Sequence, residues 1–355
     1  MRRRDVLVAV GAATLAGCGS ESADGDQSGG DPSTDEPVAP PATSTTAPES
    51  TDALRTHRPL KGVSFSPRSF ESDDFQSFFD QMGEAGPVVR WAGDWAELGG
   101  DGGPPAAILG TARERGLIPM IETGVFSASA RELFRPLTEE RTTAYVEGAA
   151  AFCEAHSPPY LGIGVEVDTH HETDPESFET FVDLFAETYS AVKAVSPDTR
   201  VYTGFQLERL RGLRGGLFGG ENDPEAANWE LLDRFPDADL IGITTYPGLI
   251  YRDPAEIPAD YYDALADRTD RPIAITETGW TCRTLVEGWE SDEDEQAAFV
   301  RRLFELTGGL DVVTLIWLWL YEQPVGEATV AFQGMSLRRD GGSGRPAWDA
   351  WVDSG

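Results

Sequence analysis

Two glutamates, each following a short apolar run, are the residues of this sequence best suited to chemistry. Glu166 follows the run GIGV, and Glu277 follows the run IAIT. Two carboxyl groups that face each other can supply a proton donor and an anion that meets a developing positive charge, the two roles that cleavage of a glycosidic bond requires. Either glutamate alone could instead cap a helix or pair with an arginine. The pair therefore predicts sugar chemistry if the fold brings both to one place.

The elements that must position these glutamates form a regular alternation from residue 60 onward. Short apolar, β-branched runs predict strands at 61–66, 87–91, 117–122, 161–167, 199–205, 239–245, 272–277 and 312–320. Amphipathic stretches predict helices at 73–85, 104–115, 139–156, 174–196, 223–235, 258–268, 292–308 and 346–352. Eight such units predict an α/β fold of the (β/α)8 (TIM) barrel type. A doubly wound open sheet is the alternative, but the run SPRSF after the first strand lacks a glycine-rich phosphate turn.

Both glutamates belong to strand ends in this interpretation, Glu166 to the fourth strand and Glu277 to the seventh. Functional groups of a parallel barrel gather at the carboxyl ends of its strands. Side chains alternate along a strand, so Glu277 should share a face with Ile275 and Glu166 should share one with Gly164. Both carboxylates are therefore expected to point into the same mouth of the barrel.

This arrangement resembles clan A of the retaining (β/α)8 glycoside hydrolases, whose acid/base glutamate ends strand four and whose nucleophile ends strand seven. The segment ITETGW at 275–280 looks like the nucleophile segment of family 17, and the run 164–208 looks like family 53 relatives. The family within the clan stays open. The resemblance implies that Glu166 is the acid/base, that Glu277 is the nucleophile, and that the carboxyl groups stand about 5 to 5.5 Å apart. It implies a β-linked glycan as the substrate and no cofactor.

Two further positions match the clan and are expected to bind substrate or the nucleophile. Arg90 ends the second strand, where the resemblance places an arginine beside Glu277, and its positive charge favours the carboxylate anion. Tyr246 follows the sixth strand, where a tyrosine hydroxyl bonds the nucleophile. A buried ion pair and a core tyrosine are the alternatives.

Aromatic residues and a histidine complete the expected sugar contacts. Trp317 and Trp319 share a face of the last strand, and one of them should form an apolar floor under a sugar ring, although both could be core residues. Trp280 ends the nucleophile segment, and His170 lies in the run DTHHETD at 168–174, which is predicted as a solvated loop of the site. Its adjacent histidines lack the spacing of a zinc motif, so no metal is expected. Weaker candidates for sugar contacts are Asp94, Trp95, Glu122, Gln206 and Glu208.

One position departs from the clan. Asparagine usually precedes the acid/base and bonds the sugar 2-hydroxyl, whereas this chain has Val165. A hydrogen bond that strengthens in the transition state contributes to catalysis. Another residue could supply it, the substrate could differ at that hydroxyl, or the protein could bind sugar without cleaving it.

The charge of the chain excludes one class of partner. The sequence has 61 acidic and 28 basic residues, a net charge of −33. Nucleic acid binding requires a basic surface, so a nucleic acid partner is not expected. The acid excess, with lysine only at Lys61 and Lys193, is typical of halophilic proteins. Genomic base bias is the alternative for the shortage of lysine.

The N-terminus predicts export and lipid anchoring. Residues 1–17, the predicted signal peptide, contain three arginines and a short apolar run, and they end within the tetrapeptide LAGC at 15–18; these features resemble a twin-arginine signal with a lipobox. Cleavage before Cys18 would leave its sulfur for lipid attachment and hold the protein outside the cell by that anchor; a chance cysteine after an ordinary signal is the alternative. Residues 18–56 predict a disordered acidic tether, and residues 57–355 the barrel. Cys153 and Cys282 are predicted at opposite ends of the barrel, hence as free thiols.

Overall fold

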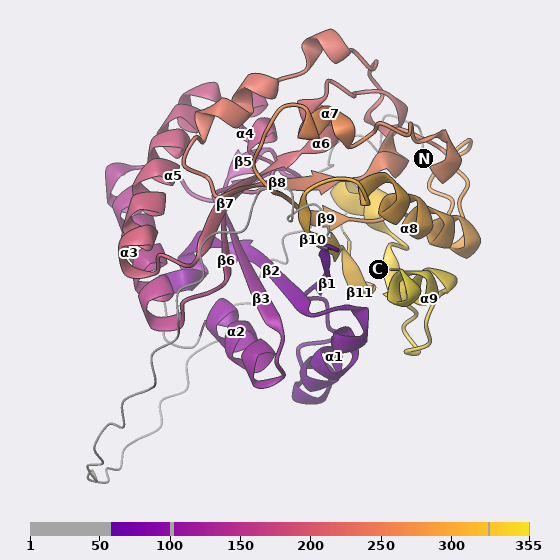
Figure 1. Ribbon diagram of the computed structural model, residues 1–355, viewed down its shortest axis with the longest axis horizontal. Helices are drawn as coiled ribbons and strands as arrows, with labels where there is room; N and C mark the ends of the chain where they lie inside the picture. The colour runs from indigo at the N-terminus through magenta and orange to yellow at the C-terminus, as the bar shows by residue number, and fades with distance from the viewer. Residues whose placement is uncertain (1–57, 100–102, 326, 355) are drawn as a thin grey trace.

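The computed structural model describes residues 58–99, 103–325 and 327–354, and its centre is a closed barrel of parallel strands (Figure 1). The barrel strands follow the order β1-β10-β9-β8-β7-β6-β3-β2. Their bounds are β1 (Leu60–Ser64), β2 (Val88–Asp94), β3 (Ile118–Gly124), β6 (Tyr160–Ile163), β7 (Arg200–Gln206), β8 (Leu240–Thr245), β9 (Ile273–Thr278) and β10 (Val312–Trp317). The predicted (β/α)8 barrel is confirmed. The predicted signal peptide, Cys18 and the tether lie outside the described residues.

Helices surround the barrel, with α3 and α5 on one side and α8 and α9 on the other (Figure 1). The long helices are α1 (Ser72–Ala85), α2 (Pro104–Glu114), α3 (Glu139–His156), α5 (Pro175–Val195), α8 (Glu293–Thr307) and α9 (Pro346–Asp353). Local capping fixes two of their starts: the side chain of Asp174 accepts a hydrogen bond from the Ser177 amide, and that of Asp292 accepts one from the Glu295 amide. No helix in the described ranges is both long and apolar enough to cross a bilayer.

Two predicted helices are wrong in the structure. The stretch 223–235 forms two 3-10 turns, η5 (Pro224–Ala226) and η6 (Trp229–Arg234), because the Asp223 side chain accepts a hydrogen bond from the Glu225 amide and closes a local turn. The stretch 258–268 keeps only α7 (Asp263–Ala266). Tyr261 and Tyr262 are both buried there, so tertiary packing overrides the helical pattern.

Shorter elements decorate the carboxyl ends of the strands. The helical pieces are α4 (Val167–Thr173), α6 (Leu207–Leu210), η3 (Trp95–Gly99), η4 (Gly216–Phe218), η7 (Pro247–Leu249), η8 (Pro254–Glu256) and η9 (Glu327–Phe332). The short strand pairs are β4 (Phe126–Ser127) with β5 (Glu132–Leu133), and β11 (Trp319–Tyr321) with β12 (Ser336–Arg338). The prediction of a solvated loop at 168–174 is wrong. Most of this run lies in α4, and Asp168, Thr169 and His170 are buried.

The apolar core has three parts. The largest fills the space between the strands and the helices. A small inner layer lies inside the barrel and contains Val88, Met120, Tyr160, Tyr202, Leu240, Ala274 and Ile316. A third group, the cap cluster, consists of Leu217, Tyr246, Leu249, Val286, Trp289, Leu318, Trp319, Ala331, Phe332 and Met335. Because most of the cap cluster comes from segments after β8, β9 and β10, it packs over one side of the barrel mouth.

Neither described cysteine forms a disulfide. Cys153 is buried in α3, and Cys282 is half-buried after β9. Both are free thiols, so this prediction is confirmed.

Candidate active site

Glu277 lies fully buried on β9 and is held by a cation and a phenol. Nη1 of Arg90 donates a hydrogen bond to its Oε2 at 2.8 Å, and the hydroxyl of Tyr246 donates one to its Oε1. Arg90 also donates to the hydroxyl of Ser64 on β1. Strands β1, β2, β8 and β9 thus fix this carboxylate, which accepts one charged and one neutral hydrogen bond.

A β-bulge turns Glu277 into the barrel. Ile243 of β8 pairs with Ile275, but the next residue, Thr244, pairs with Glu277, so Thr276 is the extra residue of β9. Ala274 belongs to the inner layer, whereas Ile275 packs in the outer core. The prediction that Glu277 shares a face with Ile275 is therefore wrong. The carboxylate reaches the interior because the bulge shifts the alternation by one residue.

Glu166 reaches the site by a different irregularity. Strand β6 ends at Ile163, and both Gly164 (φ 85°) and Glu166 (φ 50°) adopt left-handed backbone conformations before α4 begins. A Cβ on Gly164 would lie 2.5 Å from the ring of Phe181 on α5, so this position faces outward. The prediction that Glu166 shares a face with Gly164 is wrong, because the strand has already ended. A left-handed non-glycine residue is strained, and such strain is found at functional sites.

The carboxyl group of Glu166 has only neutral donors around it. Its Oε1 accepts a hydrogen bond from the hydroxyl of Thr244 at 2.7 Å and lies 3.5 Å from Nε2 of Gln206. Its Oε2 is buried without a partner. Burial raises the pKa of Glu166 well above its usual range, the hydrogen bond from Thr244 opposes this, and the negative charges of Asp168 and Glu277 raise the pKa further. The environment of Glu166 therefore favours the protonated acid.

Thr244 joins the two glutamates. It pairs with Glu277 in the β8–β9 register, and its hydroxyl donates to Glu166. Tyr246, two residues further on, donates to Glu277, and the charge of Glu166 acts on its phenol. The two carboxylates therefore belong to one buried cluster at the carboxyl ends of the strands.

A narrow cavity of about 10 Å³, roughly the space of one water molecule, lies beside Glu277. It is lined by Ser64, Phe65, Arg90, Trp91, Ala92, Glu277, Leu318 and Trp319. Trp319 thus supplies an apolar wall next to the carboxylate, whereas Glu166 is not part of the lining. Leu318 and Trp319 belong to the cap cluster, in which the ring of Phe332 also meets that of Tyr246 edge-on, with the ring centroids 4.8 Å apart.

The structure does not bring Trp317 to the carboxylates. Its Nε1 donates to the Met335 carbonyl, and its ring packs against Phe299 and Trp351 on the outer helices. The prediction that Trp317 and Trp319 share a face is wrong, because β10 ends at Trp317 and the chain bends before β11 begins.

Trp280 also packs outside the barrel. Its ring stacks on Phe299 of α8, and its Nε1 donates to Glu295 at 3.0 Å. These contacts hold the end of β9 against α8, away from the cavity beside Glu277.

His170 lies among aromatic rings. It stacks on Phe126 with the ring centroids 4.8 Å apart, meets Phe178 edge-on, and its Nε2 is 3.0 Å from the hydroxyl of Ser177. Burial lowers the pKa of His170 to about 4, so the ring is neutral in ordinary buffers. These contacts lock α4 between β4 and α5.

Thr244 and Ser64 are site residues that sequence reasoning missed. Each lies on the inner face of its strand, near the carboxyl end, and contacts a charged member of the site. The position of Thr244, four residues after the inner-layer residue Leu240, was a usable signal. Threonine and serine are common in strands and turns, so their type alone gave no indication.

Of the five weaker candidates for sugar contacts, two belong to the site and three do not. Glu122 bonds Arg90, and Gln206 approaches Glu166, so both belong to the site. Glu208 is buried elsewhere, where its Oε1 accepts from Thr245, the Tyr246 amide and Tyr261. The remaining two lie by α3: Asp94 pairs with Arg135, and Trp95 packs on Tyr145.

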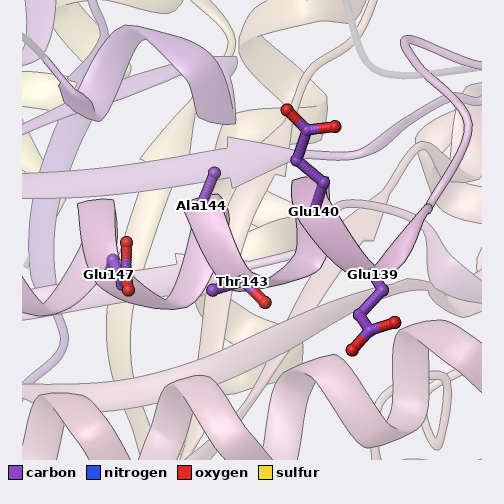
Figure 2. Close-up of a pocket in the computed structure, with 5 residues that line it drawn as sticks. All are labelled: Glu139, Glu140, Thr143, Ala144 and Glu147. Atoms are coloured by element: carbon purple, nitrogen blue, oxygen red, sulfur yellow. The ribbon is translucent and has the colours of Figure 1, made fainter.

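A second hollow lies on the outer surface of α3 and has no features of a binding site. It is lined by Glu139, Glu140, Thr143, Ala144 and Glu147. Figure 2 shows Glu139 and Glu140 pointing away from each other, so their carboxylates do not converge. Within the described part of the chain, no group of three or more histidine, cysteine or acidic side chains is placed to hold a metal ion.

The comparisons with known proteins identify the fold. No protein-family model and no curated protein matches the sequence. Among solved structures, a family 39 glycoside hydrolase from Bacteroides cellulosilyticus is similar with a TM-score of 0.58 at 20% identity over 86% of this chain; the chain spans 64% of the length of that protein. A GH5_18 variant from Streptomyces cattleya, in complex with Manb1-4GlcNAc, gives a TM-score of 0.65 at 14% identity over 83% of this chain and 80% of that one.

The GH53 catalytic domain of Ignisphaera aggregans gives a TM-score of 0.59 at 14% identity and covers 82% of this chain and 95% of that domain. Families 39, 5 and 53 all belong to clan A. This chain therefore shares the (β/α)8 barrel fold of these clan A glycoside hydrolases, the fold that the resemblance in the sequence implies. At these identities the likeness establishes the fold, and the chemistry has to be argued from the site.

Proposed function

We propose that this protein is a retaining glycoside hydrolase that cleaves β-linked oligosaccharides or polysaccharides, with Glu166 as acid/base and Glu277 as nucleophile. One observation carries the proposal: two glutamates of one buried cluster have opposite surroundings. Glu277 accepts hydrogen bonds from a guanidinium and a phenol, whereas Glu166 has neutral donors and a raised pKa. Environments that keep one carboxyl group ionised and its neighbour protonated are those that assign a base or nucleophile and an acid.

The reaction would be a double displacement. Glu166 donates its proton to the leaving glycosidic oxygen while an oxygen of Glu277 attacks the anomeric carbon, so the glycosidic bond breaks and a glycosyl ester forms. Glu166, now a carboxylate, then takes a proton from water. The water oxygen attacks the anomeric carbon and releases Glu277. Arg90 and Tyr246 would hold Glu277 in line, Trp319 would face the bound sugar, and no cofactor takes part.

The substrate-binding roles of the other residues are also proposals, and their contacts favour some of these roles more than others. Arg90 and Tyr246 contact Glu277, and Trp319 lines the cavity. Trp317 and Trp280 contact the outer helices, and His170 contacts β4 and α5, so a role in holding the site together fits their positions better than a sugar contact.

A second candidate function is a carbohydrate-binding protein without turnover. Two observations favour it: Val165 stands where the clan usually has asparagine, and neither Glu166 nor Glu277 has any exposed surface. Under either candidate, we propose that the twin-arginine signal exports the chain and that a lipid on Cys18 holds it at the outer face of the cell membrane. The long acidic tether would then let the barrel reach external glycans.

Hydrolysis assays distinguish the two candidates. The purified protein is incubated in high salt with aryl β-glycosides and with β-glucan and galactan, and the anomer formed first is read by proton NMR. Retention of configuration, abolished by Glu277→Ala, supports the enzyme. Glu179→Gln is the matched control, because Glu179 is an exposed glutamate on α5 that pairs with Arg234. Binding without turnover supports the second candidate, and inversion contradicts the retaining mechanism.

A further inference from the structure

Arg90 contacts a second carboxylate that the double displacement does not use. Its Nε donates to Oε2 of Glu122 at 2.5 Å, while its Nη1 donates to Oε2 of Glu277 at 2.8 Å. None of the three side chains is more than 2% exposed. One guanidinium is therefore shared between two buried glutamates inside the barrel.

The barrel interior is shaped to hold Glu122. A Cβ on Gly162 would lie 2.6 Å from Cγ of Glu122, and one on Gly204 would lie 3.3 Å from its Oε1. Two neighbouring strands thus present glycine where a side chain would displace this carboxylate. Burying a charge is costly unless it is paired, so a glutamate accommodated in this way needs Arg90, and Arg90 needs a carboxylate in turn.

The balance of charge around Arg90 changes during the proposed reaction. At rest, two carboxylates contact one guanidinium. When an oxygen of Glu277 bonds to the anomeric carbon, its negative charge is lost in the ester, but the guanidinium cannot lose its proton. Among the residues that the structure describes, Glu122 is then the one carboxylate still in contact with Arg90.

Esterification of Glu277 shifts Glu122 toward its ionised form. The pKa of Glu122 is raised overall before the reaction: burial raises it most, the charge and hydrogen bond of Arg90 lower it, and the charge of Glu277 raises it further. Tyr202 of β7 also lies beside it as a neutral phenol. When Glu277 becomes an ester, its repulsion disappears while the attraction of Arg90 stays.

We propose that Glu122 is a positioning residue that keeps Arg90 paired while Glu277 is esterified. The inference rests on the proposed function, because it concerns the ester intermediate of that reaction. In Glu122→Gln the guanidinium would be left unpaired in the ester intermediate, so forming the ester should become slower and hydrolysing it should not.

The test uses an aryl β-glycoside with a good leaving group, for which hydrolysis of the ester limits kcat. For Glu122→Gln we expect kcat/KM to fall by at least about tenfold. A tenfold fall corresponds to a loss of about 1.4 kcal/mol of transition-state stabilisation. At the same time kcat should be unchanged or higher, and the burst of released phenol should shrink. Glu122→Asp keeps the charge and should return kcat/KM toward the wild-type value.

Other outcomes overturn the inference. An equal fall in kcat and kcat/KM would indicate a merely structural role, and unchanged constants would indicate none. If Glu122→Gln does not fold, ¹³C NMR of the wild type trapped with a 2-fluoro glycoside reads the carboxyl group directly: an ionised Glu122 is expected, and a protonated one contradicts the inference. A wild type that turns over no glycoside at all contradicts the proposed function itself, whereas the preceding outcomes leave it standing.

Discussion

The barrel interior has two regions that are built differently. The lower region lies toward the amino ends of the strands, and the upper region lies at their carboxyl ends. Below, the inner layer is apolar, and its residues alternate regularly along their strands, as Val88, Met120 and Leu240 do. Above, the interior is polar and charged, and its two main carboxylates enter through a β-bulge and a pair of left-handed residues. The regular part can stabilise the fold, while the irregular part can place charged groups that a regular strand would direct elsewhere.

The largest effect should follow from removing Arg90. Arg90→Met leaves Glu122 and Glu277 buried without their cation, and breaking a buried ion pair in this way costs about 3–5 kcal/mol. Urea denaturation at neutral pH should show this loss, and folded protein should have no turnover. The loss should shrink at low pH, where the carboxylates protonate.

The matched variant in the lower region is Leu240→Ala. Removing this fully buried side chain should cost about 2–5 kcal/mol of stability. Its turnover per folded molecule should equal that of the wild type. The contrast between the two regions fails if Arg90→Met is as stable as the wild type, or if folded Leu240→Ala is inactive.

Glu166→Gln should reduce catalysis strongly without harming the fold. Loss of a general acid lowers the rate by about 100-fold to 10,000-fold, most for glycosides with poor leaving groups. Steady-state kinetics over a series of aryl glycosides measures this, and a similar loss for every leaving group would contradict the role.

The same variant tests the raised pKa of Glu166. In the wild type the folded protein holds this proton more tightly than the unfolded chain does, so its contribution to stability is full below the unfolded pKa of about 4.3 and is lost as pH rises through the folded pKa. Glu166→Gln removes that loss. Its stability relative to the wild type should therefore rise with pH from about 4 upward, as urea titrations at several pH values would show.

Much of the regular part could be predicted from the sequence. The β-branched runs located all the barrel strands, and α3 begins and ends at the predicted residues, because alternation and helical periodicity decide those elements. The structure also brings Glu277 and Glu166 into one cluster at the strand ends, although the geometric argument for this was wrong. Period-two alternation placed Glu277 with Ile275 and Glu166 with Gly164, and the structure contradicts both.

The rest could not be predicted, because it depends on contacts between distant segments. The bulge at Thr276 is set by the pairing of β9 with β8, and the burial of His170 is set by Phe126 and α5. Glu122 was only a weak candidate, because its partner Arg90 lies 32 residues away on another strand. Such tertiary contacts leave no periodic signal in a single sequence.

The turn before Glu166 offers a smaller test of the upper region. Gly164→Ala places a Cβ against Phe181 at a left-handed φ, which should cost about 1–3 kcal/mol. Because the turn aims Glu166, turnover should fall as well, even under conditions where the variant is fully folded. Thermal unfolding and kinetics on the same sample measure both. Stability lost without any change in turnover would show that this turn does not position the carboxylate.

The smallest effect, of opposite sign, is expected from the same substitution in a regular element. Gly148 lies within α3, where an added Cβ meets no atom within 4 Å. Gly148→Ala should therefore raise the free energy of unfolding by about 0.5–1 kcal/mol, because alanine loses less conformational freedom on entering a helix. Turnover should not change, since α3 contacts neither glutamate. If Gly148→Ala and Gly164→Ala instead shifted stability in the same direction, the left-handed turn would carry no special strain, and the distinction between a regular and an irregular part of this barrel would lose its support.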